Sequence, residues 1–344
     1  MVYRIYSRTA GIPSALISKI FSCPDTYSLT EHAEEADFFS YPTHYQVAFD
    51  YGPVDFAQHG LTDDVQPLIR QRFQELDDLA RHYNKKIIAV YVRDNAKPLP
   101  VENAVVFRTS LTASGRQCNE FAFPANGRPL HAGSESFPLF VPWQPVPAVG
   151  FRGQSLPDRL PWSEAFRNQI NLMAQRLGWR KPFKIHYNFG YLHRRNAIHF
   201  LRQLPNVSLD YRITSAADIF EDASRLAYAR NLLSNSYALC VSGHGNYSFR
   251  LYEAMAAGRI PLFVNTDCVL PLEELIDYKK LFVWVEADSL YRIGDELLAF
   301  HLRHKGEGFE ALQKQIKATW LQYLAGDNYY RHLPFYLRHF AVTG

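Results

Sequence analysis

Hydrophobic and polar positions along the chain alternate between short apolar runs and longer amphipathic segments. Residues 86–92 (KIIAVYV) form a continuous β-branched and aromatic run, which is typical of a strand buried in a parallel sheet. Residues 62–83 place apolar side chains at helical spacing, which predicts an amphipathic helix. The alternation continues along the chain and therefore predicts an α/β layer structure. Further strands are expected at 2–6, 45–49, 103–110, 148–151, 207–213, 237–242, 260–264 and 281–286, and further helices at 163–177, 194–203, 224–236 and 308–340, the last with a break near Gly326.

The chain changes character between Pro124 and Pro147. This stretch contains six prolines together with glycine and serine, so it cannot form a regular element. We place a domain boundary here. The prediction is an N-terminal domain over 1–140, a C-terminal domain over 146–320, and a helical tail over 321–344 that packs on the N-terminal domain. Two α/β domains imply a cleft, and ligands in such folds bind beyond the carboxyl ends of the strands.

Composition narrows the classes of partner. The 344 residues suffice for two domains. The net charge of +3 is too small to argue for nucleic acid, although it suits anionic ligands or transient contact with an acidic membrane. The four cysteines are far apart and include no CxxC pair, so neither a zinc site nor a disulfide framework is indicated. Because no signal peptide and no run of about 18 apolar residues occurs, we expect a soluble cytoplasmic protein.

The stretch VSGHGNYSFRLYEAMAAGRIPLF, residues 241–263, predicts a strand end, a glycine-rich turn, a helix and a second strand. Gly243 and Gly245 are expected to let the backbone adopt positive φ and approach a ligand closely. Ser248 is expected to cap the helix at its start, and Gly258 to close it. This layout offers free backbone N–H groups to a phosphate.

Arg250 lies in the first turn of that helix, where the helix dipole disfavours a cation. A diphosphate between this arginine and the backbone N–H groups would accept hydrogen bonds from both. Glu253 shares a helix face with Arg250, and a carboxylate one turn below a phosphate can accept from both ribose hydroxyls. The pair therefore points to a nucleotide-diphosphate sugar. The plainer alternative is a surface ion pair between Arg250 and Glu253 beside an ordinary turn.

Residues 232–286 also resemble the core of the exostosin-type glycosyltransferases, family GT47, and especially its bacterial members. The shared pattern is a serine followed by R-x-x-E-A, G-x-I-P, D-x-x-L-P and I-D-[WY]. The segments 34–46, 105–124 and 149–154 resemble the family more weakly. The matching positions are Ser248, Arg250, Glu253, Ala254, Gly258, Ile260, Pro261, Asp267, Leu270, Pro271, Ile276, Asp277 and Tyr278.

The resemblance implies a GT-B fold, in which two Rossmann-like domains face each other across a cleft and C-terminal helices cross back. It places the sugar donor in the C-terminal domain and the acceptor mostly in the N-terminal one, and it implies inversion at the anomeric carbon. The chain contains no D-x-D and no H-E-x-x-H, so we expect no metal and no cofactor besides the donor. Counter-charge for the leaving diphosphate would come from protein groups. The predicted donor-binding residues are Arg152, Gly153, Gly243, Gly245, Asn246, Tyr247, Ser248, Arg250, Glu253 and Asp267, although Arg152 also suits a plain surface position.

Direct displacement with inversion needs a base that takes the proton of the acceptor hydroxyl. Asp94 follows strand 86–92 at its carboxyl end and is the first candidate, although an Asx-turn residue without chemistry is an equally good interpretation. Glu120 and then His44 are its rivals. The predicted substrate-binding residues are Arg108, Ser110 and Arg116; the two arginines could instead pair with Glu120.

The sequence thus predicts a bacterial, metal-independent, inverting glycosyltransferase of hexosyl or glycuronosyl type. It would move a sugar from a nucleotide diphosphate, UDP in the first instance, to a saccharide hydroxyl during polysaccharide or glycolipid synthesis. A lipid-linked acceptor and peripheral contact with the inner membrane are compatible with the basic pI of 8.5. Two alternatives stay open: a non-catalytic nucleotide- or glycan-binding partner of a transferase complex, and a GT-B sugar-nucleotide epimerase. A dehydrogenase of the NAD type lacks its glycine fingerprint here.

Overall fold

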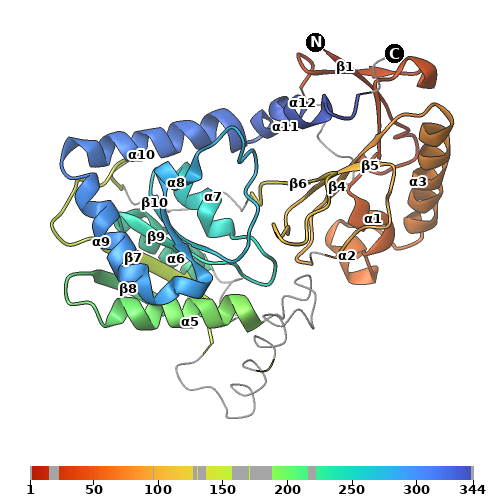
Figure 1. The fold of residues 1–344 in the computed structure, drawn as a ribbon. Coiled ribbons are helices and arrows are strands. Elements are labelled where there is room, and N and C mark those ends of the chain that lie inside the picture. Colours follow the sequence, from red (N-terminus) through yellow and green to blue (C-terminus); the bar gives the residue numbers. More distant parts are fainter. Residues whose placement is uncertain are drawn as a thin grey trace.

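The computed structural model describes residues 2–14, 23–95, 97–126, 130, 137–156, 170, 188–215 and 222–341. These residues form two α/β domains, each built on its own sheet, with helices at the end of the chain that run from one domain to the other (Figure 1). Both sheets are parallel, so the predicted fold class of two parallel-sheet α/β domains with C-terminal helices is confirmed. The helix predicted at 163–177 lies outside the described residues except at one position.

The N-terminal domain holds a six-stranded parallel sheet in the order β2-β1-β3-β4-β5-β6. Its central strand β4 is buried along its whole length, as its apolar run predicts. Helix α3 packs with a single buried stripe at helical spacing, formed by Ile69, Phe73, Leu76 and Ala80. The elements are β1 Tyr3–Tyr6, β2 Tyr27–Thr30, η3 Ala33–Glu35, β3 Phe38–Ser40, α1 Tyr45–Phe49, α2 Pro53–Gln58, α3 Val65–His82, β4 Ile87–Tyr91, β5 Ala104–Arg108 and β6 Glu120–Ala122.

The strand predicted at 45–49 is wrong, because this segment is helix α1. Tyr45 and Phe49 stand one helical turn apart and stack at a centroid separation of 4.6 Å, and both rings also contact Phe73 of α3. Five residues are too few to tell alternation from helical spacing, so packing against α3 decides. Strands β2, β3 and β6 were not predicted, because three or four residues carry too little pattern.

The C-terminal domain holds a five-stranded parallel sheet in the order β11-β10-β9-β7-β8. The predicted glycine turn lies between β9 and α7, at the carboxyl end of the central strand, and α7 ends at Gly258 with φ +65° as predicted. The elements are β7 Ala148–Gly153, α5 Asn188–Arg202, β8 Ser208–Ile213, α6 Asp222–Ser234, β9 Tyr237–Cys240, α7 Phe249–Ala256, β10 Ile260–Asn265, α8 Tyr278–Leu281, β11 Val283–Glu286, η5 Ala287–Arg292 and α9 Ile293–Arg303.

The C-terminal helices lead from the second domain back to the first. Helix α10 lies along the C-terminal domain, and α11 and α12 lie beside the first sheet, near β1 (Figure 1). The Tyr329 hydroxyl donates to the carbonyl of Ala122 at 2.6 Å, and Tyr336 stacks on Phe121 at 4.2 Å. These elements are α10 Glu307–Thr319, η6 Trp320–Leu324, α11 Asn328–His332 and α12 Pro334–Leu337.

Arg259 anchors the chain between the domains to the C-terminal core. Its side chain is fully buried, and all three guanidinium nitrogens donate to backbone carbonyls, including those of Pro138, Leu139 and Leu233. Burial lowers the pKa of Arg259 to about 10, so the side chain remains charged at neutral pH.

Replacing Arg259 with methionine would leave these buried carbonyls without donors. We expect the free energy of unfolding to fall by about 3–5 kcal/mol, measured by urea denaturation. Arg303, which is exposed, is the matched control, and Arg303→Met should change stability by less than about 0.5 kcal/mol. An equal loss in both variants would contradict the anchoring role.

Candidate functional site

The glycine-rich turn after β9 meets the N-terminal domain directly. Asn246, which is fully buried, donates its backbone N–H to the Ser110 hydroxyl at 3.0 Å and its side-chain amide to the carbonyls of Leu111 and Asp267. Its side-chain oxygen accepts from Thr266 at 2.6 Å. The side-chain amide of Asn246 is therefore used in hydrogen bonds that join the domains, which corrects its predicted role in donor binding. Ser110 is buried and accepts the hydrogen bond from the Asn246 backbone, which corrects its predicted role as a substrate ligand.

A second set of contacts closes the same edge. Asp267 accepts hydrogen bonds from the backbone N–H and the hydroxyl of Ser114, at 3.1 and 2.5 Å. Arg116 pairs with Glu273 at 2.8 Å and lies 3.7 Å from Glu274. Asp267 was predicted to bind the donor sugar and Arg116 the acceptor. Both side chains instead make polar contacts across the domain junction.

Behind the turn, the buried Arg250 and the partly buried Arg194 lie at the carboxyl ends of β7 and β9. Arg250 is 6% exposed and donates one Nη2 hydrogen bond to Asn231 at 2.5 Å. Its Nε and Nη1 have no hydrogen-bond partner among the described residues. Arg194 of α5 donates to the carbonyls of Gln154 and Val241, while its Nε likewise has none in that part of the chain.

The two guanidinium groups face the same aromatic surface. Phe151 lies 5.9 Å from Arg194 and 6.0 Å from Arg250, measured from its ring centroid. Burial, together with the smaller effect of the Arg250 charge, lowers the pKa of Arg194 to about 10. Two neighbouring cations, one buried and one partly buried, thus keep N–H groups that could donate to an anion.

Glu253 lies one helical turn after Arg250 on α7. Its carboxylate accepts a hydrogen bond from the Tyr228 hydroxyl, and the Tyr228 ring lies 5.0 Å from the Arg250 guanidinium carbon. Burial raises the pKa of Glu253, while the Tyr228 hydrogen bond and the Arg250 charge lower it. The predicted surface ion pair is wrong, because Arg250 is buried and its hydrogen bond goes to Asn231.

Arg194 was not predicted from the sequence. It lies in the first half of α5, within the stretch 155–223, which carries little pattern. The signal available was an arginine at the start of the helix predicted at 194–203, but about 40 residues separate it from the strand and glycine turn at 148–153, so the sequence did not connect the two.

Arg152 and Gly153 follow Phe151 at the end of β7. Successive side chains of a strand point to opposite faces, so Arg152 lies on the face opposite Phe151. A Cβ at Gly153 would meet only the Phe151 ring, at 3.5 Å. Arg152 therefore points away from the Phe151 ring that both arginines contact, and its Nε has no hydrogen-bond partner among the described residues, whereas Gly153 lies beside that ring.

The glycines of the turn serve close packing. Neither Gly243 nor Gly245 has a positive φ, which corrects that expectation. A Cβ at Gly245 would lie 2.9 Å from the Asp94 Cα, and one at Gly243 would lie 3.2 Å from Arg194. Ser248 precedes α7 at the N-cap position but makes no capping hydrogen bond with its side chain. The turn therefore needs glycine where the N-terminal domain and Arg194 approach it.

Among the three predicted bases, Glu120 is unsuited by its surroundings. It is buried and forms an ion pair of 2.6 Å with Arg108, which is 0% exposed. Arg108 also donates to the carbonyls of Asn95 and Lys97. The predicted alternative, in which the arginine pairs with Glu120, is the one that the structure shows, so neither residue faces a substrate.

Asp94 lies where β4 ends and faces the C-terminal domain. It is exposed, and it accepts a hydrogen bond of 2.5 Å from the Tyr247 hydroxyl. Burial and the Asp94 charge both raise the pKa of Tyr247. Burial raises the pKa of Tyr191, the Arg194 charge lowers it and the Asp94 charge raises it, so this tyrosine lies within the influence of both Asp94 and Arg194.

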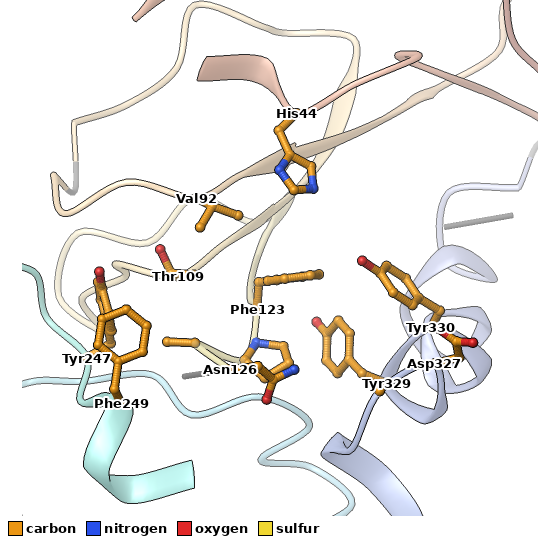
Figure 2. A pocket seen from close by; sticks show the side chains of 13 residues that line it. His44, Val92, Thr109, Phe123, Asn126, Tyr247, Phe249, Asp327, Tyr329 and Tyr330 are labelled. Atoms are coloured by element: carbon orange, nitrogen blue, oxygen red, sulfur yellow. The ribbon is translucent and has the colours of Figure 1, made fainter. Parts of the chain in front are cut away.

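His44 lines a cavity of about 310 Å³ at the domain junction (Figure 2). Tyr247 and Phe249 lie on one side of this cavity, and Tyr329 and Tyr330 lie on the other. Burial lowers the pKa of His44 to about 4, so its imidazole is neutral at physiological pH.

The shifted His44 makes stability depend on pH. Between pH 6.5 and about 4, the unfolded chain binds a proton at His44 that the folded chain does not, so this residue lowers the free energy of unfolding as pH falls through that window. We expect His44→Gln to flatten this part of the stability profile, measured by urea denaturation at a series of pH values. An unchanged slope in the variant would contradict the neutral, buried imidazole.

The described residues also bear on metal binding and on membrane insertion. Within the described residues, no three histidine, cysteine, aspartate or glutamate side chains gather closely enough to hold a metal ion. None of the helices in that part of the chain is long and apolar enough to cross a membrane.

Part of the second domain is similar to a known family. Residues 193–298 match the Exostosin GT47 domain. A stretch of 99 residues is 30% identical to Exostosin-1 of Drosophila melanogaster and covers 29% of this chain but only 12% of that protein. The similarity therefore concerns one domain of a much longer relative.

Solved glycosyltransferases resemble the whole chain more distantly. A glycosyltransferase of Rickettsia africae is 8% identical, with full coverage of both chains and a TM-score of 0.37. The calicheamicin glycosyltransferase CalG4 is 11% identical over 98% of this chain and 99% of its own, with a TM-score of 0.31. SnogD of Streptomyces nogalater is 12% identical over 93% and 95%, with a TM-score of 0.28. The fold class stands on the two parallel sheets themselves. Arg194, Arg250 and Glu253 all lie in residues 193–298, the segment that is similar to the Exostosin GT47 domain.

Proposed function

We propose that this protein transfers a sugar from a nucleotide diphosphate sugar, in the first instance a UDP-sugar, to a saccharide hydroxyl. The observation that carries the proposal is the pair of arginines near Glu253, of which Arg250 is buried and Arg194 is partly buried. Arg250 offers two guanidinium nitrogens without partners and Arg194 offers one, counted among the described residues. Cations of this kind need an anion, and a diphosphate supplies one with several acceptor oxygens.

The same arrangement accounts for the leaving group. Breaking the bond between sugar and diphosphate leaves charge on the terminal phosphate, and preorganised cations stabilise that charge as it develops. Arg194 and Arg250 supply two positive charges without proton transfer. We therefore assign stabilisation of the leaving diphosphate to these two side chains and require no metal. Glu253 accepts from Tyr228 through one oxygen, Oε2, and its other oxygen would accept from a ribose hydroxyl.

Asp94 is the base in this proposal. It is exposed, it lies across the domain junction from the donor side, and Tyr247 orients its carboxylate. Attack by the acceptor hydroxyl on the face opposite the diphosphate, with Asp94 taking the proton, inverts the anomeric carbon. The Asx-turn interpretation explains neither the contact with Tyr247 nor the close approach of Gly245.

We place the protein in polysaccharide or glycolipid synthesis at the cytoplasmic side of a bacterial membrane. The net charge of +3 and exposed aromatic residues such as Phe249 are compatible with a lipid-linked acceptor. Vesicle sedimentation with and without anionic lipid tests this contact, and absence of binding to anionic vesicles would remove the membrane from the proposal.

The transfer reaction itself is tested with purified protein, a panel of nucleotide sugars and a panel of saccharide acceptors, with release of the nucleoside diphosphate as the signal. We expect release that depends on both donor and acceptor. Nucleotide binding without release under any acceptor would favour the non-catalytic partner. Conversion of the free nucleotide sugar to its epimer would favour the epimerase.

A further inference from the structure

The cavity at the domain junction is built from four separate parts of the chain. The N-terminal domain contributes His44, Val92 and Thr109. The chain that follows β6 toward the second domain contributes residues 123–126. The C-terminal domain contributes Tyr247 and Phe249, and the returning C-terminal helices contribute residues 326–330 at or next to α11. Figure 2 shows the two groups of aromatic rings facing each other across the cavity, with His44 between them. A cavity that needs both domains and the returning helices exists only in the assembled fold.

Most of the residues that line the cavity are aromatic or otherwise uncharged. No lysine or arginine is among the described residues that line it. The His44 imidazole is neutral, because burial lowers its pKa to about 4. The Thr109 hydroxyl donates to the carbonyl of Arg93 at 3.2 Å, so it can still accept a hydrogen bond. The carboxylate present, Asp327, is exposed and disfavours an anion at the entrance.

The cavity lies next to the proposed reaction centre. Tyr247 forms one of its walls, and the hydroxyl of the same tyrosine donates to Asp94. Phe249 is 50% exposed and contacts the Tyr247 ring edge-on at 5.3 Å, so it offers an apolar face without being part of the core. A volume of about 310 Å³ is at the lower end for small-molecule sites, which suits one sugar ring.

Resting on the proposed transferase function, we propose that this cavity binds the acceptor and selects an uncharged sugar ring over a uronic acid. Phe249 and Tyr330 flank the ring with their apolar faces, and His44 and Thr109 exchange hydrogen bonds with its hydroxyls. A uronic acid would bring a carboxylate into a lining that offers it no cation and an acidic entrance, so its desolvation would go uncompensated. The acceptor hydroxyl then lies on the Tyr247 side, toward Asp94.

Saccharide binding by the intact chain tests this without turnover. Saturation-transfer NMR is recorded with methyl glycosides of glucose, galactose, mannose and N-acetylglucosamine, and with the methyl glycoside of glucuronic acid. We expect at least one neutral glycoside to bind at least about tenfold more tightly than the glucuronide. Phe249→Ala and Tyr330→Ala should each weaken that binding by about fivefold to tenfold. Tyr291→Ala, which removes a 67% exposed ring outside the cavity, is the control and should change nothing.

Calorimetric titration of UDP into each variant keeps the two proposals separate. If a variant binds UDP normally but binds the glycoside more weakly, the defect lies in the cavity. If a variant loses both UDP and glycoside binding, it has a folding defect. The other aromatic variant then tests whether the cavity binds the glycoside. Equal or tighter binding of the glucuronide would overturn the selectivity. Wild-type glycoside binding in both aromatic variants, or no binding of any neutral glycoside at millimolar concentration, would overturn the site even if the protein proves to be a transferase.

Discussion

Replacing Arg250 with alanine weakens UDP binding at least about 100-fold, the loss expected when a buried cation that donates more than one hydrogen bond to a diphosphate is removed. The structure motivates this size, because Arg250 is 6% exposed and keeps Nε and Nη1 free of partners among the described residues. Calorimetric titration of UDP measures the change directly. Arg250→Lys should recover only part of the affinity, since an ammonium group cannot reproduce the planar set of donors.

Two controls accompany this prediction. Arg303→Ala removes an exposed arginine elsewhere and should leave the affinity for UDP unchanged. Because Arg250 also donates to Asn231, thermal unfolding of the variant shows whether the fold survives. A folded Arg250→Ala protein that binds UDP as tightly as the wild type would show that the diphosphate lies elsewhere.

Arg194 should behave as the partner of Arg250. Its alanine variant is expected to lose UDP affinity as well, and the double variant should lose less than the sum of the two single losses, because either arginine alone holds the diphosphate poorly. Strict additivity in this cycle would indicate that the two side chains contact different ligands or none.

Replacing Asp94 with asparagine should leave UDP binding intact and lower kcat by at least about 100-fold, the usual contribution of a general base. Asparagine keeps the size of the side chain and can still accept from Tyr247, so the loss would report on proton transfer rather than on packing. The measurement is single-turnover transfer at saturating donor.

Tyr247→Phe is the matched control for orientation. It removes the hydrogen bond to Asp94 and keeps the ring, so we expect a smaller fall in kcat than in Asp94→Asn. Full activity in Asp94→Asn would remove Asp94 as base and leave His44, whose imidazole faces the cavity, as the remaining candidate of the three.

The sequence predicted the α/β architecture and the helix face that carries Arg250 and Glu253, because both follow from local periodicity. It did not predict the burial of Arg250, since one helix does not reveal what covers it. The Tyr228 hydroxyl that meets Glu253 comes from α6, and the Phe151 ring comes from β7, so neither is visible from the spacing along α7.

Pairing between distant segments accounts for most of the corrected residues. Arg108 and Glu120 end and begin adjacent strands, and the register of β5 against β6 brings them together in the core. Asn246 and Asp267 join two domains through contacts with residues 110–114, which lie more than 130 positions away in the chain. Glycine was expected in the turn for positive φ, but the approach of Asp94 to Gly245 is the reason the structure shows.

The most direct test of the donor site is a crystal structure of the chain grown with UDP. We expect the diphosphate between the Arg194 and Arg250 guanidinium groups, with the ribose hydroxyls within hydrogen-bond distance of Glu253. A nucleotide bound elsewhere, with both arginines still without an anion, would contradict it.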